Sequence, residues 1–237
     1  MTYIILAAGQ GRKLLPLTIN HPKTLYKLGD ETTVLQRMVR IIRKFDKDAE
    51  IVVVVGFMYQ YLRKDLEDEN VLFVHNPFYA VTSSMGSLWF AKDYLQRENV
   101  TVINGDIVVG ERLFSEIVCK HTDAPYVLID SSRREESKYN VQVQNDRVVV
   151  MSKNLTNYYA NYASVTKLDA VSSRFLYEQL DQMVNNEMYG LYYEDALVQM
   201  IFEKNFDLYY KDIKDYDWTE IDNVDDFLKA KMIFGKE

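Results

Sequence analysis

YIILAAGQGRKLLPLT, residues 3–18, joins a strand-like run to a glycine-rich loop. The run from Tyr3 to Ala7 is apolar without interruption, which is typical of a parallel strand that is buried on both faces. Gly9 and Gly11 follow almost at once. A buried strand that runs directly into such a loop indicates an open α/β sheet, in which ligands bind beyond the carboxyl ends of the strands.

The loop after this strand combines freedom of the backbone with positive charge. Glycine lets the backbone turn sharply and approach a ligand closely, and Arg12 and Lys13 follow Gly11 directly. Exposed amides beside two cations favour a polyphosphate ligand. Leu14 stands where a Rossmann motif has its third glycine, and no Gly-Lys-Ser/Thr follows, so neither a Rossmann motif nor a P-loop is present. On the glycines alone, a plain tight turn explains the loop as well.

The rest of the chain continues the alternation of strands and helices. Up to residue 130, apolar runs predict strands over residues 51–55, 71–75, 100–104 and 126–129, and helical periodicity predicts helices over residues 34–45, 84–94 and 112–121. Beyond it, we expect a hairpin over residues 140–153, strands over 163–167 and 207–213, helices over 172–184 and 194–202, and a final helix capped by Asn223. This order predicts an α/β fold with right-handed crossovers. Because no linker or repeat interrupts it, we expect a single domain over residues 1–237.

Composition narrows the classes of function. The chain has 237 residues, 48% of them hydrophobic, and Asp and Glu outnumber Lys and Arg by 35 to 28. Nucleic acids and anionic membranes both require clustered Lys and Arg, so we expect neither as a partner. The single cysteine, Cys119, has no partner for a disulfide and cannot build a cysteine-based zinc site. With no recognisable signal sequence and no apolar stretch near the ~20 residues of a membrane span, we expect a cytoplasmic protein.

Two aspartates stand where a metal ion could be held. Asp106 follows the predicted strand 100–104 after Gly105, and Asp222 ends WTEID, residues 218–222, just before the last predicted helix. Magnesium prefers one or two carboxylates together with phosphate oxygens and water. The two aspartates therefore predict a magnesium site if the fold brings them together, although each is also an ordinary turn residue.

The stretch over residues 4–29 resembles the signature of the sugar-phosphate and alcohol-phosphate nucleotidyltransferases. The resemblance rests on Leu6-Ala7-Ala8-Gly9-x-Gly11, then Pro16-Leu17-Thr18, Pro22-Lys23 and Leu25. It implies a GT-A-like fold, with a mixed, mostly parallel, Rossmann-like sheet flanked by helices. It also implies that residues 1–130 form a nucleotide-binding half and residues 131–237 an acceptor-binding half with a closing helix. Lys13 stands where the family usually has arginine, which keeps the charge but loses the bidentate fork.

The same resemblance implies roles for individual residues. Asp106 and Asp222 would hold the catalytic Mg²⁺, and Lys23 would neutralise charge on the α-phosphate. The segment 76–89 resembles that of the cytidylyltransferases that act on small alcohol phosphates, where it frames the nucleotide base. The residues implied to bind the nucleotide are Leu6, Ala7, Ala8, Gly9, Gly11, Arg12, Lys13, Ser83, Ser84, Gly86, Ser87 and Gly105. Ser83 or Ser84 can also serve as the N-cap of a helix.

The acceptor side is expected in the second half of the chain. Lys153 lies at the end of the predicted hairpin, where its counterpart in the resembled branch is at the active site, although a lysine that faces solvent fits the sequence nearly as well. Tyr193, Glu194 and Asp195 open a predicted helix. The two acids either complement the dipole of the first turn or form an anionic wall for a cationic acceptor. Because adjacent residues point in different directions on a helix, we expect only one of the acids to reach the ligand.

These features predict a Mg²⁺-dependent transfer of CMP from CTP to a small phosphorylated acceptor such as phosphocholine or phosphoglutamine. An amino-acid acceptor would also need a cation for its carboxylate, and the sequence does not identify one. The alternatives are a uridylyl- or thymidylyltransferase that acts on sugar 1-phosphates, and a non-catalytic nucleotide-binding regulatory subunit on the same fold.

Overall fold

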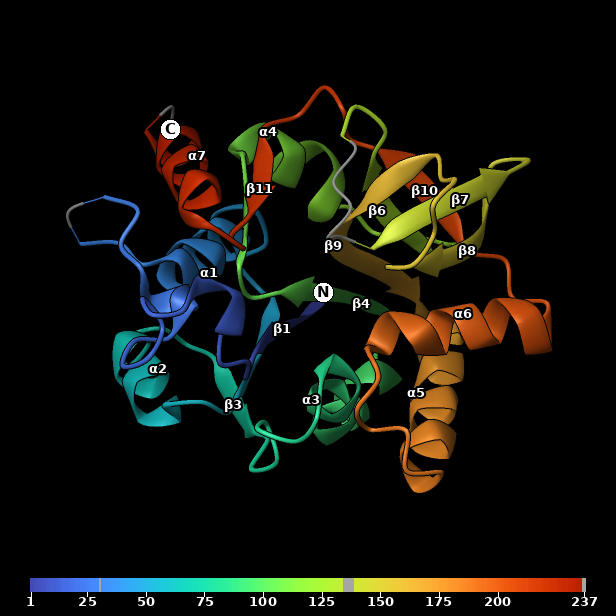
Figure 1. The fold of residues 1–237 in the computed structure, drawn as a ribbon, viewed down its shortest axis with the longest axis horizontal. Helices are drawn as coiled ribbons and strands as arrows, with labels where there is room; N and C mark the ends of the chain where they lie inside the picture. Colours follow the sequence, from blue (N-terminus) through green and yellow to red (C-terminus); the bar gives the residue numbers. More distant parts are fainter. Residues whose placement is uncertain (30, 134–138, 236–237) are drawn as a thin grey trace.

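The computed structural model describes residues 1–29, 31–133 and 139–235, and its centre is a nine-stranded sheet in the order β3-β2-β1-β4-β9-β6-β10-β8-β7 (Figure 1). The strands are β1 (Thr2–Ala7), β2 (Glu50–Val55), β3 (Leu72–His75), β4 (Asn99–Asn104), β6 (Tyr126–Asp130), β7 (Asn140–Gln144), β8 (Arg147–Ser152), β9 (Ala160–Asp169) and β10 (Tyr209–Asp212). The glycine-rich loop leaves β1, an interior strand of this sheet, as the α/β prediction requires.

The two halves of the sheet differ in the direction of their strands. β1 runs parallel to both β2 and β4, and β2 runs parallel to β3. β9 is antiparallel to β4 and to β6, and β7 and β8 form the expected hairpin. The mixed α/β class is confirmed, with a Rossmann-like parallel half and a second half in which antiparallel pairs prevail.

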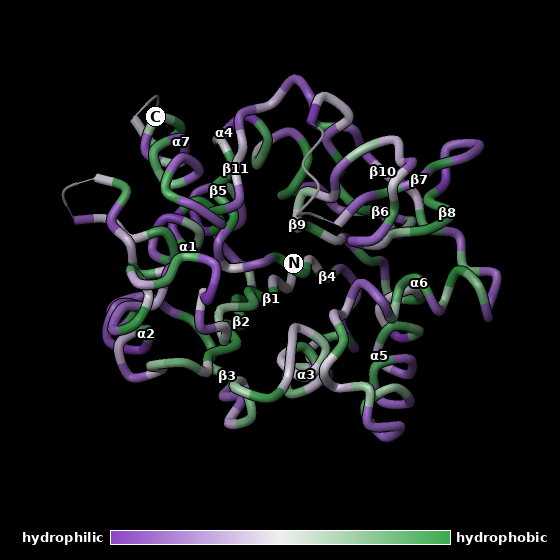
Figure 2. The backbone as a smooth tube through the Cα atoms, in the orientation of Figure 1, coloured by the Kyte–Doolittle hydropathy of each residue, from purple (hydrophilic) through white to green (hydrophobic). Residues whose placement is uncertain are grey.

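Helices cover both faces of the sheet because successive residues of β1 point to opposite sides. Tyr3 and Ile5 belong to the core that packs under α1 (Val34–Phe45), whereas Ile4 belongs to the core under α5 (Ala170–Asn185). In Figure 2 the hydrophobic colouring follows β2 and β3, and the tip of the β7–β8 hairpin is hydrophilic. The remaining helices are α2 (Tyr59–Asp65), α3 (Ser84–Phe90), α4 (Glu111–Leu113), α6 (Tyr193–Lys204) and α7 (Val224–Phe234), with short turns η1 (Arg12–Leu14), η2 (Lys23–Leu25), η3 (Lys92–Gln96) and η4 (Phe114–Val118).

Several local details differ from the expectation. The helix predicted over residues 84–94 ends at Phe90 and resumes as the 3₁₀ turn η3, and the helix predicted over 112–121 changes to π-helical geometry at Phe114. The seven-residue helix α2 was not anticipated. The strand pair β5 (Ile107–Val109) and β11 (Trp218–Glu220) was also missed, because three-residue strands carry too little periodicity to be recognised. None of the helices in the described part of the chain is long and apolar enough to cross a membrane.

Candidate active site

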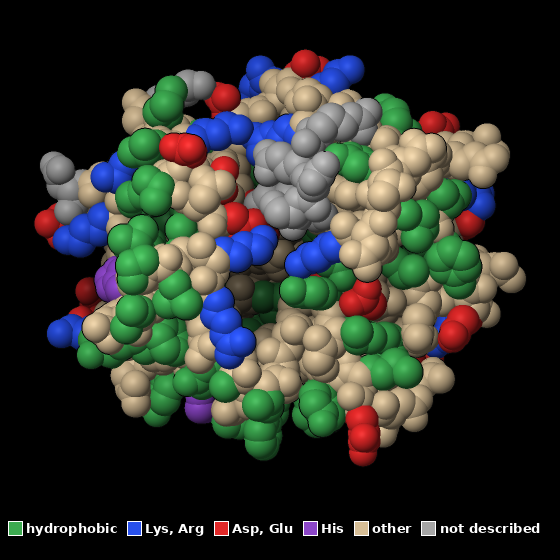
Figure 3. Space-filling view, in the orientation of Figure 1, with side chains coloured by type: hydrophobic (Ala, Val, Ile, Leu, Met, Phe, Trp, Pro, Cys, Tyr) green, Lys and Arg blue, Asp and Glu red, His purple; other side chains and the backbone are tan. Residues whose placement is uncertain are grey.

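A cleft of about 430 Å³ opens at the carboxyl ends of β1 and β4. Its lining comes from both halves of the chain, from Leu6 at the end of β1 to Asp222 before α7. Lys and Arg side chains gather around the hollow in the space-filling view (Figure 3). A cleft at this edge of an open α/β sheet is where the fold places its ligands.

The glycine-rich loop forms one wall of the cleft. Gly11 has a φ of 64°, a left-handed conformation that L side chains rarely adopt, and an added Cβ would lie 3.0 Å from the Thr18 side chain. Thr18 in turn donates a hydrogen bond of 2.8 Å to the Gly11 carbonyl, which holds the loop in this shape. Arg12 and Lys13 are exposed beside it. The residue type at position 11 is therefore set by backbone conformation.

Most of the residues expected to bind the nucleotide lie along the cleft. Ala7 does not, because it points into the core beneath the sheet. Gly86 and Gly105 also lie behind the surface, where an added Cβ would come within 2.7 Å of Thr82 and 2.9 Å of the Leu6 carbonyl respectively. The expected residues that line it are Leu6, Ala8, Gly9, Gly11, Arg12, Lys13, Ser83, Ser84 and Ser87.

Asp106 and Asp222 meet because β11 pairs with β5. The register places Glu220 opposite Ile107, and the Ile221 amide donates a hydrogen bond of 3.0 Å to the Asp106 carbonyl. The Asp222 amide then donates a hydrogen bond of 3.0 Å to Asp226 in the first turn of α7. Two aspartates far apart in the sequence thus face one point, and the helix cap holds the second of them in place.

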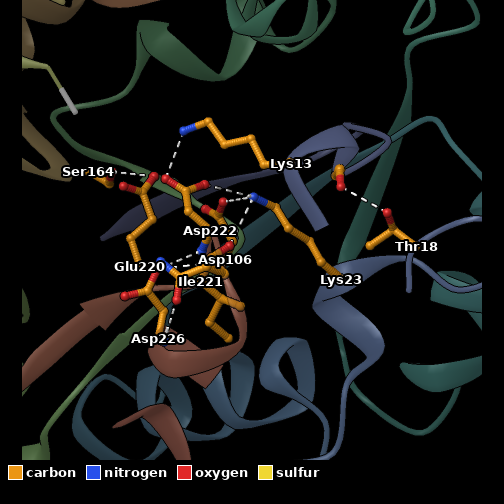
Figure 4. A network of polar contacts seen from close by, with 11 residues as sticks. Lys13, Thr18, Lys23, Asp106, Ser164, Glu220, Ile221, Asp222 and Asp226 are labelled. Carbon is orange, nitrogen blue, oxygen red and sulfur yellow. Dashed lines mark hydrogen bonds and ion pairs between the residues drawn. The ribbon is translucent and has the colours of Figure 1, made fainter. Parts of the chain in front are cut away.

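Lys23 occupies the space between these two aspartates (Figure 4). Its Nζ contacts Asp106 Oδ2 directly and lies 3.9 Å from Asp222 Oδ1. Burial by itself would lower the pKa of Lys23, but the surrounding carboxylates, Asp106 first among them, outweigh it and raise the pKa. Lys13 approaches from the loop, with its Nζ 2.9 Å from Asp222 Oδ2. Lys23 is therefore an ammonium ion at neutral pH, held by carboxylates at the floor of the cleft.

The aspartate pair could hold a magnesium ion. The side chains of Asp106 and Asp222 are only 10% and 13% exposed, and they already share one cation, Lys23. The described residues contain no cluster of three or more His, Cys, Asp or Glu side chains arranged to bind a metal by themselves. A site with two carboxylates suits Mg²⁺, which takes its remaining ligands from water and substrate phosphates.

The opposite wall of the cleft is aromatic. Tyr139 and Tyr192 stack edge to face with their ring centroids 5.6 Å apart, and both line the cleft. The ammonium group of Lys153 lies 3.8 Å from the centroid of the Tyr192 ring and 5.4 Å from that of Tyr139. Lys153 therefore belongs to the cleft and does not point freely into solvent.

Glu194 is the acid of the second half that reaches the cleft. It is 3% exposed and lines the cleft, and Ser84 Oγ lies 3.4 Å from one of its carboxylate oxygens. Burial raises the pKa of Glu194 to about 8, an effect that the nearby positive charge of Lys153 only partly opposes. The protonated, neutral form of this carboxyl group is therefore favoured at pH 7.

Tyr193 and Asp195, which the sequence places beside the acceptor, lie behind the wall instead. Tyr193 is fully buried, and its hydroxyl is 2.5 Å from that of Tyr162. Asp195 accepts hydrogen bonds from the Tyr192 amide at 2.9 Å and from the Tyr139 hydroxyl at 3.0 Å. The helix turns these two side chains away from the ligand, and the residues that line the cleft are their neighbours Tyr192 and Glu194.

Other lining residues were not anticipated from the sequence. Glu220 lines the cleft beside Asp222, and its carboxylate accepts a hydrogen bond of 2.9 Å from Ser164. The period-two alternation of a strand ending at residue 220 would have placed Glu220 and Asp222 on the same side. Tyr139 carries no comparable signal, because only the tertiary fold brings it to the cleft, whereas Tyr79 falls within the segment 76–89 that was expected to frame the base.

Known proteins share this architecture. The model of the MobA-like NTP transferase domain matches residues 3–182. The choline-phosphate cytidylyltransferase of Streptococcus pneumoniae is 25% identical over 238 residues, which cover 100% of both chains. The CTP:phosphoglutamine cytidylyltransferase of Campylobacter jejuni is 24% identical over 249 residues, covering 95% of this chain and 97% of the relative.

Among solved structures, the CTP:phosphocholine cytidylyltransferase from Streptococcus pneumoniae superposes with a TM-score of 0.80 at 22% identity, over 98% of each chain. This likeness shows a common fold. The match to the family model extends from β1 to α5 and includes the glycine-rich loop, Lys23 and Asp106. The chain therefore belongs to the MobA-like NTP transferase family and is a nucleotidyltransferase.

Proposed function

We propose that this protein is a Mg²⁺-dependent cytidylyltransferase, which transfers CMP from CTP to a small phosphorylated acceptor and releases pyrophosphate. The observation that carries the proposal is the placement of Lys23 between Asp106 and Asp222, in a cleft with the glycine-rich loop on one side and an aromatic wall on the other. Such a cleft can hold a triphosphate and a second substrate with their phosphates adjacent.

The glycine-rich loop suits the nucleotide. Its amides and the side chains of Arg12 and Lys13 supply donors and positive charge for the phosphates. Ser83, Ser84 and Ser87 line the cleft from α3 and the turn before it, and they offer hydroxyl groups to the ribose or base. The choice of CTP rests on the two sequence relatives, whose names both specify transfer of a cytidylyl group.

The chemistry requires positioning and charge neutralisation more than acid–base catalysis. An oxygen of the acceptor phosphate attacks the α-phosphorus in line, a new P–O bond forms, and the bond to pyrophosphate breaks. A phosphate monoester is mostly dianionic at pH 7, since its second pKa is ~6, so the nucleophile needs no base to remove a proton. Lys23 lies where it can stabilise the charge that develops on the α-phosphate. When bound, Mg²⁺ would be held by Asp106 and Asp222 and would neutralise phosphate charge.

The acceptor is proposed to be a phosphorylated amino alcohol or amino acid, of the phosphocholine or phosphoglutamine type. Tyr139, Tyr192 and Glu194 form a wall that can contact a positively charged nitrogen, which a sugar phosphate lacks. The names of the two relatives agree with such an acceptor. The CDP-linked product would then serve in the decoration of a surface polysaccharide such as a capsule.

A screen of pyrophosphate release tests this proposal. The purified protein with Mg²⁺ is incubated with each of CTP, UTP, ATP and GTP against phosphorylated amino alcohols, phosphorylated amino acids and hexose 1-phosphates. We expect release with CTP and an amine-bearing acceptor. Release only with UTP and a hexose 1-phosphate would favour the sugar-nucleotide alternative. Nucleotide binding without release from any pair would favour a regulatory subunit.

A further inference from the structure

Lys153 sits on the aromatic faces that would otherwise receive a cationic ligand. Its ammonium group is 3.8 Å from the centroid of Tyr192 and 5.4 Å from that of Tyr139. Aromatic faces attract cations through their quadrupole, and cages of this kind bind quaternary ammonium groups. Here the protein's own ammonium takes that position, so a trimethylammonium group would compete with Lys153 and meet a like charge.

The two rings are held in place from behind. Asp195 accepts a hydrogen bond from the Tyr139 hydroxyl through Oδ1, and one from the Tyr192 amide through Oδ2. Each carboxylate oxygen of Asp195 thus holds one of the two tyrosines by a hydrogen bond. Asp195 itself does not line the cleft. These two hydrogen bonds fix the orientation of the two tyrosine rings, and the rings in turn fix the position of Lys153.

Within the described part of the chain, Lys153 has no carboxylate at ion-pair distance. Lys13 and Lys23, which also line the cleft, each lie within ion-pair distance of Asp222, and Lys23 also contacts Asp106. No carboxylate of the described residues forms an ion pair with Lys153, although it lines the same cleft. An ammonium group carries three N–H donors, and those that point away from the rings can bind an acceptor. Lys153 is thus suited to receive an anion from the ligand.

Glu194 lies in the same part of the cleft and complements Lys153. Burial raises its pKa to about 8, so it carries little negative charge at pH 7 while the cleft is free of ligand. A ligand ammonium placed beside it would stabilise the ionised form. The charged groups around it are Lys153, Glu220 and Asp195, and the buried hydroxyls of Tyr139, Tyr162 and Tyr193 complete its surroundings.

We propose that the acceptor is a phosphorylated amino acid, whose carboxylate binds Lys153 and whose ammonium group binds Glu194. This rests on the proposed cytidylyl transfer and narrows its acceptor to a zwitterion. A choline headgroup offers one positive charge to a wall that already holds one. An amino acid instead brings a partner for each of the two side chains, and its phosphate remains free to face Lys23. Lys153 then determines which acceptor is used.

Pairs of acceptors that differ only in the carboxylate test the proposal. O-phosphoserine is compared with phosphoethanolamine, and O-phosphohomoserine with 3-aminopropyl phosphate, with phosphocholine as a further amine. The quantity measured is kcat/KM for pyrophosphate release with CTP and Mg²⁺. We expect the carboxylate to raise kcat/KM by roughly 10- to 100-fold in at least one pair, the range for a hydrogen bond between charged groups.

Variants then assign that preference to Lys153. In Lys153→Met the preference for the carboxylate should fall to about onefold, and Lys153→Arg should restore part of it because the positive charge remains. Lys92 is the matched control, since its ammonium also lies over two rings, Trp89 at 4.7 Å and Tyr177 at 5.2 Å, but it does not line the cleft. Lys92→Met should keep the preference of the unmodified enzyme. The rise in melting temperature on adding CTP checks that each variant is folded.

The outcomes separate this inference from the proposed function. Pyrophosphate release with phosphocholine or phosphoethanolamine that equals or exceeds release with the amino acids would overturn the inference and leave cytidylyl transfer standing. The same holds if Lys153→Met keeps the carboxylate preference. If pyrophosphate is released only with hexose 1-phosphates, or with none of the acceptors, both the inference and the proposed function are wrong. A carboxylate preference that disappears in Lys153→Met and returns in Lys153→Arg supports both.

Discussion

The two walls of the cleft are built in different ways. The nucleotide wall comes mainly from one short loop, in which Gly9 to Lys13 follow β1 directly, and its floor is an alternating set of cations and carboxylates. The acceptor wall is assembled from Tyr139, Lys153 and Tyr192, which come from separate segments of the second half. Aromatic contacts and the hydrogen bonds of Asp195 hold them together. Lys13 and Lys23 of the first wall form ion pairs with carboxylates, whereas Lys153 of the second forms none with a carboxylate of the described residues.

This contrast suggests that the first wall serves the transfer reaction and the second wall the choice of acceptor. A wall of paired charges and backbone amides binds phosphates, which every substrate of such an enzyme carries. A wall of side chains on separate segments can change one residue at a time without disturbing the phosphate site. Substitutions in the floor should therefore strongly reduce turnover, whereas substitutions in the aromatic wall should alter the choice of acceptor.

The largest effect is expected at the floor. Asp106→Asn and Asp222→Asn should each reduce kcat by about 10²- to 10³-fold, comparable to the loss of one preorganised charge-stabilising group in other enzymes. EDTA should abolish activity and Mg²⁺ should restore it. Asp48→Asn is the control, because Asp48 is exposed just before β2, at the opposite edge of the sheet. Full turnover in either floor variant would remove that aspartate from the site.

Lys23 comes next. Lys23→Ala should lower kcat more than it weakens the binding of CTP, because the ammonium stabilises charge that redistributes in the transition state. Its raised pKa keeps it protonated through neutral pH, so its titration should not reduce the rate between pH 6 and 8. Lys47→Ala, an exposed lysine before β2, is the control. A variant with a raised KM and an unchanged kcat would restrict Lys23 to ground-state binding.

The next effect is the stabilisation of the folded protein by the nucleotide that binds the first wall. CTP at 100 times its Kd should stabilise the folded protein by about 2.7 kcal/mol, roughly 5–10 °C in melting temperature for a chain of this size. UTP, ATP and GTP at equal concentration should give smaller shifts. A larger shift with UTP than with CTP would favour the sugar-nucleotide alternative.

The acceptor wall should also make the stability of the folded protein depend on pH. Burial raises the pKa of Glu194 from 4.5 to about 8, so the folded protein retains a proton that the unfolded chain releases. The stability that this carboxyl contributes is complete below about pH 4.5 and is lost as the pH rises through about 8. The melting temperature of Glu194→Gln minus that of the unmodified protein should therefore increase as the pH is raised from 6 to 9. An unchanged difference across that range would show that Glu194 has an ordinary pKa.

Local patterns in the sequence were sufficient for much of the fold. β1, α1 and the β7–β8 hairpin were predicted within a residue or so of their ends, because a continuous apolar run, a helical period and an Asn-Asp turn are local signals. The cap at Asn223 is confirmed by its hydrogen bond with the Asp226 amide. The β5–β11 pair was not predicted, since its strands are three residues long and lie far apart in the chain.

The sequence by itself determined which residue types are present for phosphate chemistry: the glycines after β1, Lys23, Asp106 and Asp222. Their grouping could be expected only because the ends of parallel strands share one edge of a sheet. Tertiary structure alone decided that the β5–β11 pair brings Asp222 to Asp106, that Glu194 is buried enough to hold its proton, and that Lys153 rests on two tyrosines. Burial and contacts between distant segments depend on how the whole chain packs, and no local pattern of residues encodes them.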